Sequence, residues 1–171
     1  MSSGVKVCDS VIECFTNMKV RKMCSKEEGK KRKKAVLLVL NDSQELIVLD
    51  KKKEILSGDL MDGTITDALQ VFAEMLPKNG CCYALFDLSY ETKESKKEEL
   101  VFIHWNPDAA TVKDKMVYAS SADALRKKII GIKHEWQITS LEDLLDVNVW
   151  AEKLGQNVVS VECRKVELQC H

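Results

Sequence analysis

Two apolar runs separated by a highly charged segment constrain the fold of this chain most strongly. The runs span residues 82–88 and 100–105, and the charged segment between them spans residues 91–99. Runs that are apolar at almost every position are typical of strands buried on both faces of a sheet. We therefore expect two neighbouring strands joined by a charged turn at 91–99. Cys81 and Cys82 should point to opposite faces of the sheet, because they are adjacent in a strand.

Weaker patterns elsewhere predict helices. Apolar residues recur with helical spacing at 11–18, 69–76 and 112–129. Ser140 has the position of an N-cap for a last helix, which Gly155 ends.

Short apolar segments bounded by turn residues predict the remaining strands, at 35–40, 45–49, 135–138 and, at the sheet edge, 158–161. We expect a mobile arm at 1–7, an exposed charged segment at 21–34 and turns at 57–66. This order predicts an α/β fold of the α+β type, with a central mixed, mostly antiparallel β-sheet sandwiched between α-helices.

Composition argues against several classes of protein. The 171 residues are 45% hydrophobic, so one soluble domain is expected. The net charge is −1, so no overall excess of positive charge favours nucleic-acid binding. An aromatic content of 6% without a stacking motif argues the same way. Seven cysteines without a secretory leader indicate a reducing compartment, and no Cys/His spacing indicates a metal. We expect a monomer without a cofactor.

Four segments together resemble the actin-depolymerising factor/cofilin family, and vertebrate members in particular. They are Lys30-Lys-Arg-Lys-Lys-Ala-Val36, Tyr90-Glu-Thr-Lys-Glu-Ser-Lys-Lys97, Lys115-Met-Val-Tyr-Ala-Ser-Ser121 and Gly131-Ile-Lys-His-Glu-Trp-Gln137. The resemblance implies one actin-depolymerising-factor homology domain at 4–155, a flexible arm at 1–3, and a C-terminal strand or tail at 156–171. It implies a protein that binds and reshapes a polymer, not an enzyme.

Some positions depart from the family pattern. His104 stands where an aromatic residue is usual and Cys82 where a basic one is usual. The segment 62–71 and the tail from residue 162 also diverge.

Two surfaces for actin are expected. Lys113, Lys115 and Met116 open the long helix, where lysines oppose the helix macrodipole and an exposed methionine offers a deformable apolar contact. Read without the family, they form an ordinary solvated helix start. The resemblance makes them the main actin contact. It also implies a second surface, used for filaments, on the turn carrying Lys96 and Lys97.

The last helix, with Glu142, Asp143, Glu152 and Lys153, would complete that second surface. The actin-binding residues implied by the resemblance are Ser3, Gly4, Val5, Lys96, Lys97, Lys113, Lys115 and Met116.

The resemblance also implies regulation. Phosphorylation of Ser3 by a kinase, reversed by a phosphatase, would add about −1.5 to −2 charges against an acidic partner. Ser2 would be acetylated after loss of Met1. A pH response would involve His134 and an acidic residue at Glu98 or Glu99, with Glu99 at the position of a usual aspartate. Phosphoinositide headgroups would bind Lys113, Lys115, Arg126, Lys127, Lys128, Lys133 and His134.

The basic run Lys30, Lys31, Arg32, Lys33 and Lys34 reads as a nuclear-import signal or as a solvated segment. The family uses this run to enter the nucleus, so we expect cytoplasmic and cytoskeletal protein with nuclear import.

Three alternatives stay open. A non-severing relative would coat or sequester actin, and a lipid adaptor would bind phosphoinositides alone. A cysteine hydrolase would pair Cys81 or Cys82 with His104 or His134, but no orienting third group or nucleophile elbow is visible.

Overall fold

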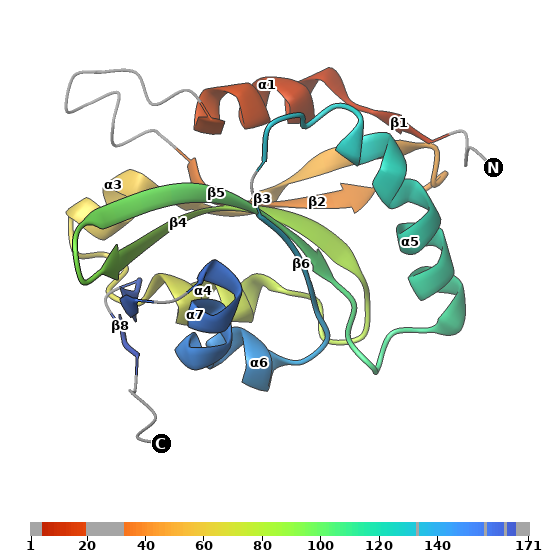
Figure 1. The fold of residues 1–171 in the computed structure, drawn as a ribbon. Coiled ribbons are helices and arrows are strands. Elements are labelled where there is room, and N and C mark those ends of the chain that lie inside the picture. The colour runs from red at the N-terminus through yellow and green to blue at the C-terminus, as the bar shows by residue number, and fades with distance from the viewer. Residues whose placement is uncertain (1–4, 20–32, 133, 156, 163, 167–171) are drawn as a thin grey trace.

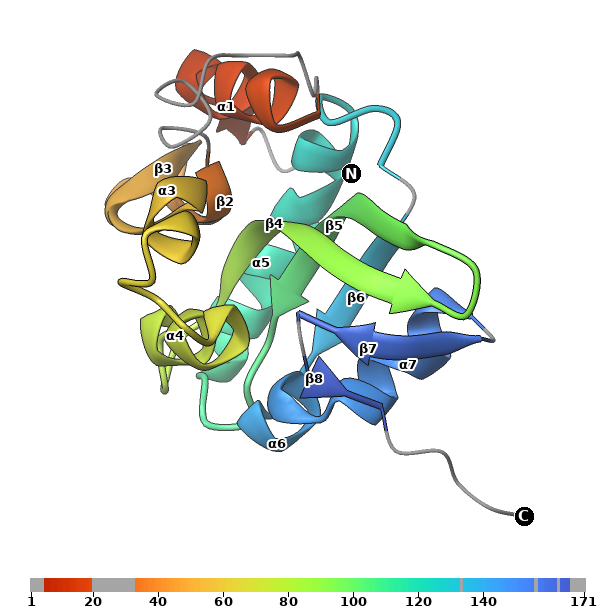
Figure 2. The same ribbon diagram turned by 90° about the vertical axis from the view of Figure 1, so that its left-hand side faces the viewer.

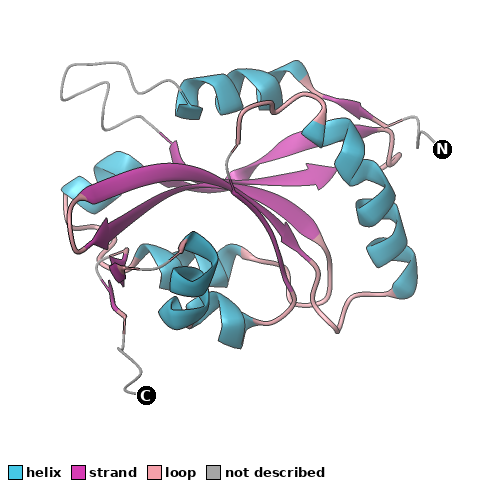
Figure 3. Cartoon of the chain, in the orientation of Figure 1, coloured by secondary structure: helices cyan, strands magenta, loops and turns pink. Residues whose placement is uncertain are grey.

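The computed structural model of the chain describes residues 5–19, 33–132, 134–155, 157–162 and 164–166. These residues form a twisted central sheet with helices packed on both of its faces (Figure 1, Figure 3). The mixed sheet between helices that the sequence predicts is therefore confirmed.

The main path of the sheet runs in the order β1-β3-β2-β4-β5-β6. Neighbouring strands are antiparallel except for the parallel pairs β1–β3 and β5–β6. These strands are β1 (Lys6–Val7), β2 (Lys33–Leu40), β3 (Leu46–Leu56), β4 (Cys82–Thr92), β5 (Lys96–Trp105) and β6 (His134–Ile138). Two further strands, β7 (Val158–Val161) and β8 (Arg164–Lys165), extend the sheet from the outer end of β4 (Figure 2).

Two layers of helices cover the sheet. Residues of α1 (Asp9–Lys19) and α5 (Val112–Arg126) pack into the core on one face. Residues of α4 (Ala68–Met75), α6 (Leu141–Leu145) and α7 (Val147–Leu154) pack into the core on the other. A short helix, α3 (Ser57–Met61), follows β3.

The central strand β4 explains the near-continuous apolar run that the sequence shows. Cys82 and Phe86 belong to the core beneath α4, α6 and α7, while Tyr83 and Leu85 belong to the core beneath α1 and α5. Alternate side chains enter different cores, so both faces of the strand require apolar residues. Cys81 lies with the second group, which confirms that the two adjacent cysteines face opposite sides.

Two predicted loops are ordered elements instead. Within the expected mobile arm, Lys6 and Val7 form β1 in register with Leu46 and Ile47. Residues 57–61, expected as turns, form α3. Both adjoin β3, which is predicted to end at residue 49 but continues through the charged segment 50–54 to Leu56. Charged residues fit there because β1 covers only the first residues of β3 and the rest is a sheet edge.

The predicted last helix is two helices. Ser140 caps α6 by accepting a hydrogen bond from the Asp143 amide at 3.2 Å, as expected from its position. The chain then turns at Asp146, which accepts from the Asn148 amide at 3.0 Å and caps α7. An aspartate inside an apolar helical pattern is a local signal for such a restart. Gly155 ends α7 with a φ of 116°, a left-handed conformation that favours glycine.

Candidate functional site

The outer face of α5 presents apolar side chains to solvent. Thr111 caps the helix by accepting from the Asp114 amide at 3.1 Å. Val112 and Met116 then follow with side chains that are 72% and 67% exposed. They are at i and i+4, so they lie on one face of the helix. Lys113, also exposed, borders this pair. We call Val112, Lys113 and Met116 the α5 face.

Lys115 does not join Lys113 in the charged patch that the sequence suggested. Its ammonium group donates to the Asp108 carbonyl at 3.3 Å and the side chain is partly buried. Residues at i and i+2 point to different sides of a helix, which is why the two lysines separate. The apolar partner that sequence reasoning missed is Val112, although its position at the start of a polar helix turn is a visible signal.

The inner side of α5 fixes how this face is presented. Tyr118, Ala122 and Leu125 are buried against the sheet. The Tyr83 hydroxyl on β4 donates to the Tyr118 carbonyl. The Tyr118 hydroxyl accepts from the Leu40 amide at 3.1 Å. Two strands therefore hold the middle of the helix, and the α5 face is carried on a fixed support.

The N-terminal arm reaches the same side of the molecule. Ser3 and Gly4 lie outside the described residues, but Val5 and Val7 pack against the core that α5 also covers. Strand β1 is held by hydrogen bonds from the Lys6 amide to Glu45 and from the Cys8 amide to Ile47, each 2.9 Å. Figure 1 shows this end of the chain beside α5.

The hairpin of β4 and β5 forms a second projecting region, and Lys96 and Lys97 belong to its strand, not to its turn. Lys96 lies opposite Glu91, with 3.7 Å between the ammonium and the carboxylate, and Lys97 lies opposite Tyr90. The expected turn at 91–99 shrinks to 93–95, which Thr92 closes by donating its amide to the Ser95 carbonyl at 2.8 Å. The opposite charges of Glu91 and Lys96 face each other across the antiparallel pair, which supports the longer strands.

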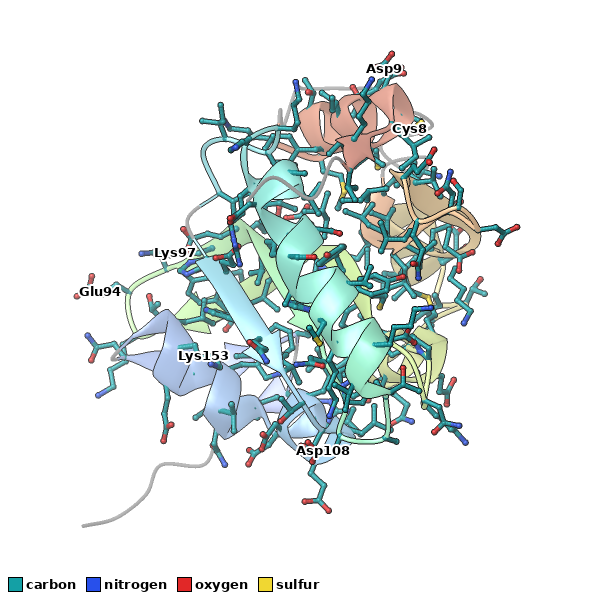
Figure 4. All side chains as sticks on the ribbon, turned by 90° about the vertical axis from the view of Figure 1, so that its right-hand side faces the viewer. Cys8, Asp9, Glu94, Lys97, Asp108 and Lys153 are labelled. Carbon is teal, nitrogen blue, oxygen red and sulfur yellow. The ribbon has the colours of Figure 1, made fainter. Side chains whose placement is uncertain are left out.

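Helix α7 packs against Trp136 in the middle of β6. The Lys153 ammonium sits 5.9 Å from the centre of the Trp136 ring, and Trp136 packs edge-on against Trp150 at 5.2 Å. Figure 4 places Lys97 and Lys153 along one side of the domain, whereas Asp108, just before α5, lies at another. We call Lys96, Lys97 and Lys153 the hairpin surface. Glu142 and Asp143 lie in the first turn of α6 and Glu152 is exposed on α7.

The predicted basic cluster at the end of α5 is divided by the sheet. Arg126 is paired with Asp123 at 2.6 Å and with Glu135 at 2.5 Å, and these partners raise its pKa. Lys127 and Lys128 are exposed, and Lys133 lies outside the described residues. Adjacent residues of a strand face opposite ways, so His134 points away from Glu135 and from α5.

His134 meets Glu99 instead. Its Nε2 atom lies 3.4 Å from Glu99 Oε1, and both side chains are 17% exposed. The same Glu99 oxygen accepts a hydrogen bond from the buried Tyr90 hydroxyl. Of the two acidic positions considered from the sequence, the structure places Glu99 at His134. Sequence reasoning missed Tyr90, which only the strand pairing brings to this pair.

Part of the basic run at 30–34 is not exposed. Residues 30–32 lie outside the described part, Lys33 pairs with Glu54 at 2.5 Å, and Lys34 is buried. The Lys34 ammonium lies 2.8 Å from a Glu162 carboxylate oxygen and donates to the Ser89 hydroxyl at 3.0 Å. The expectation that Lys34 is solvated is therefore wrong, because a carboxylate from the C-terminal segment compensates its charge.

The cysteines are poorly placed for nucleophilic chemistry. Burial raises the pKa of both the Cys81 and the Cys82 thiols, so they hold their protons. His104 packs on the same sheet face as Tyr83, opposite to Cys82, and burial and Arg126 lower its pKa.

Across the described residues, no group of three or more His, Cys, Asp or Glu side chains could hold a metal ion. None of the described helices is long and apolar enough to cross a membrane.

Comparisons with known proteins agree with this geometry. A family model described as cofilin/tropomyosin-type actin-binding protein matches residues 12–155. A Streptomyces griseoflavus cofilin structure is 32% identical, covers 86% of this chain and 95% of its own, and has a TM-score of 0.63. Plasmodium berghei actin depolymerization factor 2 is 29% identical, with coverages of 84% and 92% and a TM-score of 0.67.

A Caenorhabditis elegans glia maturation factor shares the fold at 15% identity, covering 84% of this chain and 93% of its own, with a TM-score of 0.55. The family match spans most of the chain and includes α5, the β4–β5 hairpin, β6 and α7. The chain therefore belongs to the cofilin/tropomyosin-type actin-binding protein family.

Proposed function

We propose that this protein binds both monomeric and filamentous actin and that it severs and depolymerises filaments. The family is defined by actin binding and not by catalysis. The observation that carries the finer proposal is the presence of two separate exposed surfaces on one domain, the α5 face and the hairpin surface. Figure 1 shows α5 and the hairpin tip at opposite ends of the sheet.

Two surfaces suffice for the mechanism. The α5 face combines two exposed apolar side chains with Lys113, which suits docking into an apolar cleft on an acidic partner. The lysines of the hairpin surface would contact a second subunit of the same filament. Binding that favours a changed arrangement of two neighbouring subunits shifts the filament toward that arrangement and weakens its contacts. Severing then requires no chemical step.

Co-sedimentation with actin filaments tests this proposal. The unchanged protein should appear in the pellet and raise the amount of actin in the supernatant. Lys113→Ala/Met116→Ala should lose both effects, while Lys78→Ala, an exposed lysine outside both surfaces, should keep them. Lys96→Ala/Lys97→Ala should keep binding to actin monomers and lose binding to filaments. Filament binding without released actin would favour the alternative of a relative that only coats or sequesters actin.

Phosphoinositide binding is a second candidate. Lys127 and Lys128 are exposed where α5 ends, next to Ile130, whose side chain is 72% exposed. Basic residues near an anionic surface contribute on the order of 1 kcal/mol each. Vesicles with a phosphoinositide should bind the protein, vesicles of neutral lipid should not, and Lys127→Ala/Lys128→Ala should bind less. His134 lies on the other sheet face, so it is a poor member of this set.

Regulation by modification and pH belongs to the same proposal. A phosphate on Ser3 would add negative charge to the N-terminal arm and repel an acidic partner, so Ser3→Glu should lower actin binding and Ser3→Ala should not. Loss of charge on His134 with rising pH should increase severing through the hairpin surface.

For nuclear import we propose Lys30, Lys31 and Arg32, since Lys34 is buried. The likeness to vertebrate members stays a prediction.

A further inference from the structure

The hairpin that carries Lys96 and Lys97 extends beyond the rest of the sheet. Strand β2 pairs with β4 only as far as Phe86, and β6 pairs with β5 only from Val101 onward. Among the described residues, the outer half of the hairpin therefore has one further strand neighbour, β7, which pairs with residues 90–92 of β4. Figure 2 shows β7 alongside the outer part of the hairpin.

The strand register connects β7 directly to the two lysines. Val161 of β7 lies opposite Tyr90 of β4, and Tyr90 lies opposite Lys97 of β5. The next row of paired residues leads in the same way from β7 to Lys96. Hydrogen-bonded neighbouring strands are held about 4.7–4.9 Å apart. The position of β7 therefore constrains the strand segment that presents both lysines.

Glu162, the residue after β7, fixes the end of that strand where β2 and β4 separate. Its Oε1 atom accepts a hydrogen bond from the Ser89 amide at 2.7 Å and lies 2.8 Å from the Lys34 ammonium. Its own amide donates to the Ser89 carbonyl at 2.8 Å. The Lys34 and Glu162 side chains are each 7% exposed, so water competes little for these contacts. One carboxylate thus joins β2, β4 and β7.

The backbone of Glu162 has a conformation that its contacts must maintain. Its φ of 48° lies in the left-handed region, which residues other than glycine adopt at a cost. Such a conformation persists where the surrounding structure determines it. Here the surrounding structure is the buried cluster with Ser89 and Lys34, so these contacts and the turn conformation support each other.

We propose that Glu162 is a positioning residue for filament binding. The buried contacts of its carboxylate with Ser89 and Lys34 hold β7 against the hairpin, and β7 holds Lys96 and Lys97 in the orientation that a second filament subunit requires. This inference rests on the proposed function, which assigns that subunit to the hairpin surface. Residues of β7 pack into the core beneath α4, α6 and α7, whereas α5 packs on the other face of the sheet. Binding of actin monomers through the α5 face should therefore be independent of Glu162.

The first experiment compares the affinities of Glu162→Gln for actin filaments and for actin monomers. The substitution keeps the size of the side chain and removes its charge. Filament affinity in co-sedimentation should fall about tenfold, the factor that corresponds to weakening one charge-assisted hydrogen bond. Monomer affinity should be unchanged. An equal loss of both affinities would overturn the proposal.

Arg164→Met is the matched control. Arg164 lies in the same C-terminal segment, but its side chain donates to the Asp67 carboxylate and to the Leu145 carbonyl, outside the hairpin. This variant should keep both affinities. A loss of filament affinity as large as that of Glu162→Gln would contradict a specific role for Glu162.

A double variant separates positioning from general stability. Lys34→Met/Glu162→Met replaces the buried ion pair with two apolar side chains, an exchange that often preserves or raises stability. The carboxylate that binds the Ser89 amide is still missing, so filament affinity should stay low although the thermal unfolding temperature returns to that of the unchanged protein. Recovery of filament affinity together with the unfolding temperature would show that Glu162 contributes only to stability, and the proposal would fall.

Amide hydrogen exchange in the free protein tests the same contacts without actin. In both Glu162 variants, amides of the outer hairpin, at residues 87–100, should exchange about tenfold faster relative to those of α5. Unchanged relative exchange would overturn the proposal. If the hairpin amides respond but Lys96→Ala/Lys97→Ala leaves filament binding intact, Glu162 does hold the hairpin and the filament surface in the proposed function is wrong.

Discussion

The α5 side of the sheet and the hairpin end treat their buried polar groups differently. Beneath α5, His104 Nε2 and Ser121 Oγ are buried and have no hydrogen-bond partner among the described residues. At the hairpin end, the buried Lys34 is paired with Glu162 and Ser89. A buried polar group without a partner destabilises the fold, so removing it should stabilise the protein. Removing one member of a buried ion pair leaves an uncompensated charge, so it should destabilise the protein.

Polar and charged groups also hold the C-terminal segment in place, at the hairpin end and at the ends of α4 and α6. The Arg164 side chain donates to the Asp67 carboxylate and, at 3.2 Å, to the Leu145 carbonyl. Glu162 accepts from the Ser89 amide at 2.7 Å and, with a φ of 48°, directs the chain from β7 to β8. Charges therefore hold this region together, whereas apolar contacts and two tyrosine hydroxyls hold α5.

The largest effect on stability should follow from breaking the buried pair. Lys34→Met keeps the apolar stem beside Phe86 and removes only the ammonium. Burial already raises the pKa of Glu162, with Lys34 acting in the opposite direction, so the remaining carboxylate would be uncompensated. We expect a loss of about 3 kcal/mol in the free energy of unfolding, measured in urea.

Lys33→Met is the matched control for that variant. Its ion pair with Glu54 is about one-third exposed and should contribute less than about 1 kcal/mol. Equal losses for the two variants would show that the buried pair has no special role.

His104 should make stability depend on acid. Burial and the Arg126 charge lower its pKa, so the folded protein resists the proton that the unfolded chain accepts below about pH 6.5. The free energy of unfolding should therefore fall as the pH decreases below that value, by at most about 1.4 kcal/mol per pH unit. His104→Phe restores an aromatic side chain and should reduce this slope. Identical slopes in urea melts of both proteins would contradict the assignment.

Ser121→Ala should have a smaller effect and of the opposite sign to most core substitutions. Its hydroxyl is buried without a partner in the described residues, so removing it eliminates a desolvation cost. We expect a gain of up to about 1 kcal/mol in thermal unfolding at neutral pH. A clear loss of stability would mean that the hydroxyl is satisfied in solution.

The α5 face should matter least for stability and most for binding. Val112 and Met116 are exposed, so Val112→Ser/Met116→Ser should change the free energy of unfolding by only about 0.5 kcal/mol. Filament affinity should fall at least tenfold if both apolar contacts are buried in the complex, by about 1.4 kcal/mol or more. Unchanged affinity in co-sedimentation would move the actin contact away from this face.

Much of the architecture was predictable because it depends on local patterns. The apolar runs that became β4 and β5 and the helical spacing in α5 each reflect which faces are buried over a few residues. The predicted end of α5 at residue 129 was three residues late, since the helix ends at Arg126. The segment of β3 beyond residue 49 was not predictable, because its charged residues are tolerated only at a sheet edge.

The candidate sites divide in the same way. Met116 was predictable as an exposed residue at the start of α5, whereas the separation of Lys115 from Lys113 follows from a contact with Asp108. The sequence shows that Arg126 and His134 are close along the chain, but it does not show that their partners lie on opposite faces of the sheet. Arg126 pairs with Glu135 and His134 lies beside Glu99, so the two basic residues do not form one cluster.

The sequence by itself determined the family, the strands and helices of the core, and the residue types available for binding. Only the tertiary structure decided which charged side chains are paired within the fold and which are exposed for binding. Lys34 is paired with Glu162, Arg126 with Glu135, and Tyr90 and His134 with one oxygen of Glu99. The physical reason is that periodicity records burial along one element, whereas electrostatic pairing depends on which elements the strand register brings together.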